Sequence, residues 1–205
     1  MLTSNRFQIL THQQKTGYWN AALARVMEEC RRLASYLQAE IRAKRLAVCT
    51  CLVGRTNALS PGGINTDDLE ELVKDYQLEL SSPFEGVASI SGGVWRASEY
   101  FESDADDALL KLRFEPGTRD LPIHSHDYSD RVIFVADGKA EFVICDAEET
   151  KVIEVSRGDV LIFARGLRHT FRTGEESLLL LSYHSPFIEL EDSRQYTLTD
   201  ERSLA

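Results

Sequence analysis

Ile123-His124-Ser125-His126-Asp127 and Gly166-Leu167-Arg168-His169 are the two stretches that decide how this chain folds. Neutral histidine is the commonest metal ligand among the side chains, and residues two apart on a strand point to the same face. His124 and His126 are therefore expected to converge on one point, and a second strand can supply His169. The sequence thus predicts three imidazoles from two strands around one site.

The sequence around these histidines is rich in strand signals. Asp137-Gly138 separates the apolar runs 131–135 and 141–144, a pattern typical of a β-hairpin. Further short strands are expected at 87–90, 93–101, 108–114 and 178–184, because apolar and β-branched residues there lie between Gly or Asp clusters. Many short strands in succession indicate a sandwich or barrel, so the fold class is mainly β.

The spacing of the histidines and glycines resembles the two motifs of the cupin superfamily. In the first motif, Gly117 is followed by six residues, His124 and His126, and a run that ends at Gly138. In the second, Gly158, Gly166 and His169 fall in register, while Ala164 and Thr173 replace the family's proline and asparagine. The resemblance covers about residues 105 to 185. It implies a double-stranded β-helix, or jelly-roll barrel, that binds one divalent transition metal such as Fe, Mn, Ni or Zn.

The carboxylate ligand of the family has no clean equivalent here. Counting forward from His126 puts Asp130 in its place, whereas counting back from Gly138 puts Arg131 there. If Asp130 turns inward, the ligand set becomes His124, His126, Asp130 and His169, with open positions for substrate. If Arg131 turns inward, its cation opposes a divalent metal but can hold a carboxylate or phosphate. The spacing alone leaves both arrangements open.

Candidate catalytic residues lie on the expected last strand. Tyr183 and His184 are neighbours there and must point to opposite faces, so one of them is presented to the barrel interior. Tyr183 is suited to act as a general acid, and His184 to act as a proton shuttle.

The N-terminal region differs from the rest in charge and periodicity. Residues 1–58 carry nine Lys or Arg and three Glu, a balance of +6, which leaves 14 basic and 30 acidic residues, or −16, for the remainder. Apolar residues from Ala22 to Ile41 recur at helical spacing. We expect a helix whose apolar stripe packs on the protein's own acidic barrel or on a second copy of the chain.

We therefore expect three regions: a helical N-terminal region (1–80), a cupin barrel (81–190) and a polar C-terminal tail (191–205) in which the chain is mobile. No apolar run approaches the roughly 20 residues of a membrane span, and no leader pattern opens the chain. These features, with four dispersed cysteines, predict a cytoplasmic protein that does not bind membranes. The net charge of −10 argues against a nucleic-acid binder, and a homodimer is expected.

Two function classes are compatible with these features. In the first, the protein is a metal-dependent enzyme that acts on a small polar molecule, with dioxygenase, isomerase or lyase chemistry as the resemblance implies. In the second, it is a non-catalytic sensor that signals ligand or metal occupancy to a protein partner through the helical segment. We favour the enzyme. The fold does not separate the two classes, because function resides in the site. A cavity open to solvent and a metal with free coordination positions would favour the enzyme, whereas a closed site and an exposed apolar helix face would favour the sensor.

Overall fold

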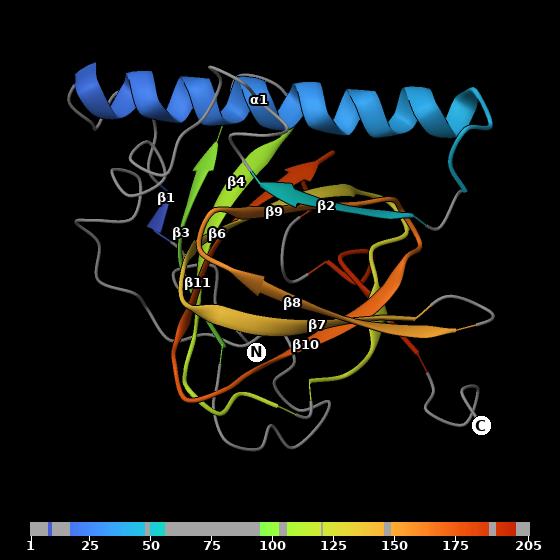
Figure 1. The fold of residues 1–205 in the computed structure, drawn as a ribbon. Helices are drawn as coiled ribbons and strands as arrows, with labels where there is room; N and C mark the ends of the chain where they lie inside the picture. The colour runs from blue at the N-terminus through green and yellow to red at the C-terminus, as the bar shows by residue number, and fades with distance from the viewer. Residues whose placement is uncertain are drawn as a thin grey trace.

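In a computed structural model of the chain, the described residues are 8–9, 17–47, 50–55, 95–102, 106–119, 121–145, 149–188 and 192–199. Their strands form two facing sheets, and a long helix crosses the outside of one of them (Figure 1). This is the predicted fold class: a mainly β jelly-roll barrel with an N-terminal helix. The described part contains no helix with the length and apolarity that a bilayer span requires.

The larger sheet has seven strands in the order β1-β3-β4-β11-β6-β9-β2. Its β1–β3 pair is parallel, and its other pairs are antiparallel. The strands are β1 (Gln8–Ile9), β2 (Cys51–Arg55), β3 (Trp95–Glu102), β4 (Ala108–Phe114), β6 (Asp130–Asp137), β9 (Asp159–Phe163) and β11 (Leu178–Ser185).

The smaller sheet has five antiparallel strands in the order β12-β5-β10-β7-β8. They are β5 (His124–Ser125), β7 (Lys139–Cys145), β8 (Thr150–Ser156), β10 (Arg168–Thr173) and β12 (Thr197–Leu198). An apolar core fills the space between the two sheets. It includes Ile133 and Val135 of β6, Phe142 of β7, Phe171 of β10 and Leu180 of β11.

Strand β6 is buried on both faces. Ile133 and Val135 point into the barrel, whereas Val132 and Phe134 belong to a second core on the outside of the sheet. Side chains alternate along a strand, so Arg131 has the inward parity and Asp130 the outward parity. Because apolar residues occupy both faces of β6, its hydrophobic pattern does not reveal which face is inside.

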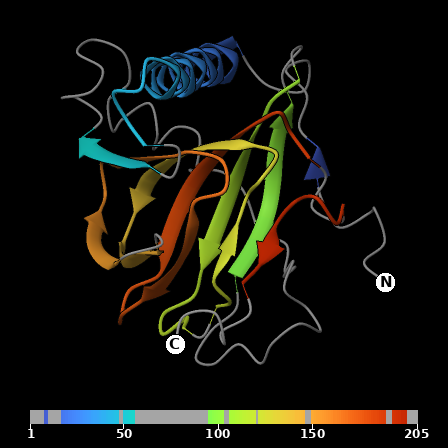
Figure 2. The ribbon, with the colours of Figure 1, turned by 90° about the vertical axis from the view of Figure 1, so that its right-hand side faces the viewer.

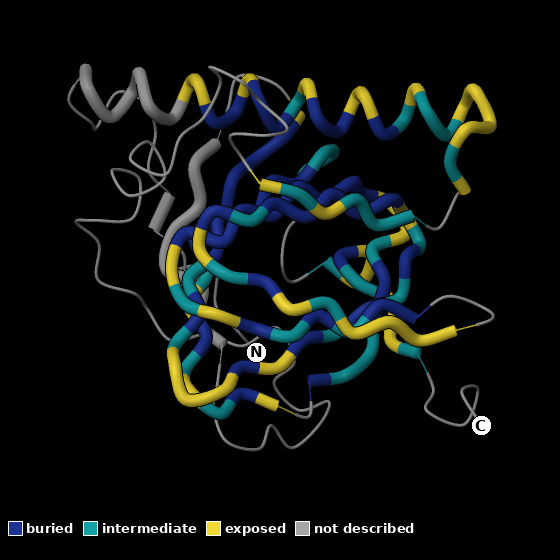
Figure 3. The backbone as a smooth tube through the Cα atoms, viewed as in Figure 1, coloured by how far each residue is buried: buried dark blue, intermediate teal, exposed yellow. Residues whose placement is uncertain are grey.

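Helix α1 (Gly17–Arg42) covers that second core. Figure 2 shows it lying over the outer face of the larger sheet, and Figure 3 shows buried residues along its sheet-facing side. Its apolar stripe consists of Val26, Met27, Cys30, Leu33, Ala34 and Leu37, all buried. Arg31 also donates from Nε and Nη2 to Asp107 of the barrel, at 2.7 and 3.1 Å. The stripe therefore packs on the protein's own barrel, and the homodimer remains a prediction.

The predicted hairpin at Asp137-Gly138 is wrong in its pairing. The turn joins β6 and β7 as expected, but these strands belong to different sheets and form no ladder with each other. The chain instead turns a corner of the barrel, where the Arg157 and Gly158 amides donate to the Gly138 and Val135 carbonyls. The Asp137-Gly138 turn reverses the direction of the chain, but the packing of the barrel determines which strands pair.

Gly138 is required at this corner. Its φ is +80°, and a Cβ added to it would lie 1.9 Å from the Ser177 carbonyl oxygen. We expect Gly138→Ala to lower the free energy of unfolding by roughly 2–4 kcal/mol, measured by denaturant titration. Gly174→Ala is the matched control, because a Cβ there meets no atom within 4 Å. Equal stability of the two variants would contradict the prediction.

Two further expectations have different outcomes. The expected strand at 87–90 lies outside the described residues. The predicted tail is not wholly separate from the barrel, because β12 pairs with β5 and Gln195 is buried. The hydrophobic pattern of this C-terminal segment did not predict the packing, because the contacts that Gln195 makes are polar.

Candidate metal centre

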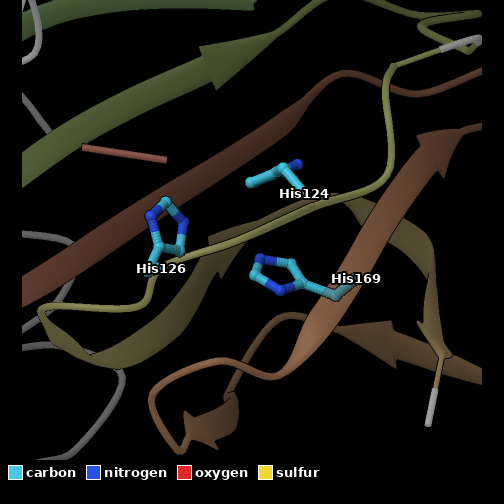
Figure 4. Close-up of side chains that lie close together, drawn as sticks. All are labelled: His124, His126 and His169. Carbon is cyan, nitrogen blue, oxygen red and sulfur yellow. The ribbon is translucent and has the colours of Figure 1, made fainter. Parts of the chain in front are cut away.

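The three predicted histidines lie together inside the barrel. His124 on β5 is the direct cross-strand partner of His169 on β10, and His126 follows β5 on the same face. One ligand nitrogen of each histidine lies within 4.8 Å of the others. Figure 4 shows the three imidazoles gathered between β5 and β10. The structure thus brings together the group that the spacing predicted, and this group is able to hold a metal ion.

Backbone carbonyls fix the orientation of all three rings. Nδ1 of His124 lies 3.0 Å from the Pro122 oxygen, and Nδ1 of His169 lies 2.9 Å from the Leu167 oxygen. Nδ1 of His126 lies 2.6 Å from the Gln195 oxygen. A carbonyl oxygen only accepts, so Nδ1 of His124 and Nδ1 of His169 carry the proton and their Nε2 atoms keep a lone pair. Metal-binding histidines are held in this way, with one nitrogen donating so that the other can ligate.

Burial keeps these imidazoles neutral. It lowers the pKa of His124 to about 4, with a smaller contribution from the Arg131 cation. Burial also holds the pKa values of His126 and His169 well below their usual range, and Arg131 again adds to the effect. A metal ligand must be deprotonated, so the three side chains are in the required form at neutral pH. The donor set therefore fits a borderline divalent transition metal.

Asp130 does not join the histidines. Its carboxylate accepts from Nε2 of Gln38 in α1 at 2.7 Å and from Nη2 of Arg165 at 3.2 Å, on the outward face of β6. Arg131 instead faces the histidines, with Nη2 3.0 Å from Nδ1 of His126. The predicted ligand set is therefore corrected: Asp130 does not belong to it. The extra residue between His126 and Gly138 puts a cation where the family places its carboxylate.

Of the two candidate catalytic residues, only His184 faces the cavity. The Tyr183 hydroxyl donates to Asp107 at 2.7 Å beneath α1, and burial and that hydrogen bond raise its pKa. Tyr183 is therefore a structural residue of the helix–sheet contact, which corrects its proposed role as a general acid. His184 points into the barrel beside Ser182, whose Oγ lies 3.0 Å from His184 Nε2. Catalysis by His184 remains a prediction.

A small cavity of about 80 Å³ adjoins the three histidines. One wall is polar, and the opposite wall is made of apolar side chains from both sheets. The polar residues are His124, His126, Arg131, His169, Ser182, His184 and Gln195, and the other lining residues are Leu110, Leu112, Phe114, Ile133, Phe142, Phe171, Leu180 and Tyr196. The sequence reasoning missed Gln195 and Tyr196, because no motif marks the C-terminal segment that folds back here.

Separate substitutions of the two neighbouring residues Asp130 and Arg131 on β6 should distinguish their roles. Asp130→Ala should leave metal affinity unchanged while lowering stability by about 1–3 kcal/mol, because it removes two hydrogen bonds to a buried carboxylate. Arg131→Met should raise metal affinity about tenfold or more, since it removes a cation from a low-dielectric site. Isothermal titration with Mn(II) and Zn(II) measures both. Weaker metal binding in the Asp130 variant would contradict the assignment of its side chain to the outer face.

The comparisons with known proteins agree with this architecture. Residues 110–184 match the family model described as Cupin domain, so this part of the chain is a cupin domain. No curated protein matches the sequence significantly.

Several solved structures resemble the fold. A cupin-2 domain from Rhodospirillum rubrum is 16% identical, with 64% of this chain and 83% of that chain covered and a TM-score of 0.47. A cupin domain from Schizosaccharomyces pombe is 16% identical, with coverages of 48% and 63% and a TM-score of 0.38. An oxalate oxidase in complex with the substrate analogue glycolate is 20% identical, with coverages of 38% and 41% and a TM-score of 0.35. The chain thus spans less than half of that oxidase, and its function has to be argued from its own site.

Proposed function

We propose that this cupin is a metal-dependent enzyme that acts on a small polar molecule. The observation that carries the proposal is the common orientation of the three imidazoles, in which each Nδ1 lies within hydrogen-bond distance of a backbone carbonyl. His124, His126 and His169 would hold the ion through Nε2. When bound, the metal would supply Lewis acidity or redox chemistry next to the cavity.

The cavity walls suit a reaction on a small substrate. Most of the side chains that line the cavity are buried, and a low-dielectric wall strengthens electrostatic interactions beside it. His184 lies in this wall and offers a titratable nitrogen for moving a proton at the substrate. Three protein ligands leave coordination positions open, as catalytic metal sites do.

The position of α1 favours the enzyme over the sensor. A sensor that signals through the helix needs an apolar face available to a partner, but the stripe on α1 is buried on the barrel. The side of α1 away from the barrel is mainly polar in the described residues, with Tyr36 as its exposed large apolar side chain.

Metal analysis of protein purified without an affinity tag tests the proposal. We expect one divalent transition metal per chain, and X-ray absorption at its edge should show three imidazole nitrogens at roughly 2.0–2.2 Å. Metal-stripped and reloaded protein should then be compared for turnover of small acids, with oxygen uptake as one readout. Absence of stoichiometric metal after reconstitution with Fe(II), Mn(II), Ni(II) and Zn(II) would contradict the proposal.

A further inference from the structure

Two buried polar atoms in the cavity wall have no hydrogen-bond partner among the described residues. They are Nε of Arg131 and Nδ1 of His184. Arg131 is 2% exposed and His184 is 3% exposed, so water outside the protein does not solvate either of them. A buried polar atom without a partner costs stability, and each such atom in a native protein calls for an explanation.

These two atoms belong to side chains that share one surface. His184 of β11 is the direct cross-strand partner of Arg131 of β6, so their side chains project together from the same face. Both line the cavity next to the three histidines. The two side chains thus contribute neighbouring parts of the same cavity wall.

Both nitrogens can donate. Arg131 uses Nη1 to contact the Ser129 hydroxyl and Nη2 to donate to Gln195 Oε1 at 3.2 Å, which leaves Nε–H. Nδ1 of His184 carries a proton in the tautomer in which the Ser182 hydroxyl donates to Nε2. Nε of Arg131 therefore requires an acceptor, and in this tautomer the same acceptor can serve Nδ1 of His184.

Charge indicates that this acceptor is an anion. Among the described residues, no carboxylate oxygen lies within 4.0 Å of the Arg131 guanidinium, since Asp130 is bonded to Gln38 and Arg165 on the other face. A buried cation without a counter-ion is strongly disfavoured. A carboxylate would neutralise the charge and accept from both nitrogens.

The size and the apolar wall of the cavity limit the rest of the ligand. A volume of about 80 Å³ equals on the order of five waters at roughly 10–15 Å³ each. This space suits a carboxylate with one or two further carbons. Leu110, Leu112, Ile133 and Leu180 then provide an apolar surface for the carbon chain.

We propose that Arg131 and His184 form a carboxylate-binding subsite beside the three histidines, and that the ligand is a short-chain monocarboxylate. As an assignment of the enzyme's substrate class, this inference rests on the proposed function. Binding of the carboxylate itself does not require the metal, because both donors belong to the protein. The two proposals can therefore fail separately.

The test uses full-length protein stripped of metal and titrated calorimetrically with sodium acetate, propionate and hexanoate at constant ionic strength. We expect saturable binding of acetate or propionate and none of hexanoate, which exceeds the cavity. Arg131→Met and His184→Leu should each weaken binding by about 10- to 100-fold, the size of effect expected for a hydrogen bond to a charged group. His184→Asn, whose amide nitrogen can replace Nδ1, should retain binding within about threefold.

Arg172→Met is the matched control, because Arg172 is an exposed arginine of the smaller sheet and pairs with Glu141. It should leave carboxylate binding unchanged. If Arg131→Met does not fold, the two His184 variants still decide the question. Failure of metal-free wild-type protein to bind either short acid, hexanoate binding as tight as propionate binding, or undiminished binding in His184→Leu would overturn the subsite. Metal analysis of the same proteins before stripping, or after reconstitution, reports on the proposed function independently.

Discussion

Replacing His126 and His169 together by alanine is expected to abolish stoichiometric metal binding. The two side chains come from different motifs and supply two of the three nitrogens in the group. A single remaining imidazole, His124, leaves a divalent ion with one protein ligand, and a metal site of this kind needs three or four. We expect metal content to fall from about one ion per chain to background, as measured by mass spectrometry after reconstitution.

The matched control for this experiment is the double variant Asp130→Ala with Tyr183→Phe. Both residues point to the outer face of the larger sheet, where they bond Gln38 and Asp107. This variant should keep its full metal content despite some loss of stability. Circular dichroism must show that both double variants are folded. Full metal occupancy in the folded histidine variant would show that the ion binds elsewhere.

Placing charge on the buried face of α1 is expected to have the second large effect. Leu33 is 2% exposed and Leu37 is fully buried, and both pack on the outer core of the larger sheet. Burying a Leu side chain contributes about 1.5–3 kcal/mol, and an unpaired carboxylate in the same place adds a desolvation cost of several kcal/mol. Leu33→Asp with Leu37→Asp should therefore detach the helix or unfold the protein.

Light scattering and thermal unfolding measure this outcome. We expect aggregation or a loss of the cooperative transition, because release of the helix exposes the apolar outer face of β6, β9 and β11. Deletion of residues 20–45 should have the same consequence. Tyr36→Asp is the control on the same helix, since Tyr36 is 50% exposed, and it should change stability little. A monodisperse Leu33/Leu37 variant with an unchanged melting temperature would contradict the docking of α1.

The contact between α1 and the barrel also joins the basic N-terminal region to acidic residues of the barrel. Arg31 of the basic N-terminal region pairs bidentately with the buried Asp107 of the acidic region, and Gln38 hydrogen-bonds Asp130. Asp107 and Asp130 thus serve the helix–barrel contact.

Local patterns in the sequence determined the fold class and the histidine group. Short alternating runs between glycines predict strands because side chains alternate with a period of two, and β4, β6 and β11 lie where these runs predicted them. Two histidines two residues apart must share a face, and His169 matched the spacing of the second motif. Periodicity likewise predicted the helix that α1 forms between Gly17 and Arg42. These features depend only on neighbours along the chain.

Tertiary structure alone decided which of two adjacent residues faces the site. Asp130 and Arg131 have opposite parity on β6, but both faces of that strand are apolar, because the barrel core covers one and α1 covers the other. The same ambiguity applied to Tyr183 and His184 on β11. Gln195, which orients His126, was also beyond sequence reasoning, because its contact joins residues 69 positions apart. Local periodicity fixes alternation along a strand, whereas only the packing of distant segments fixes which side is the interior.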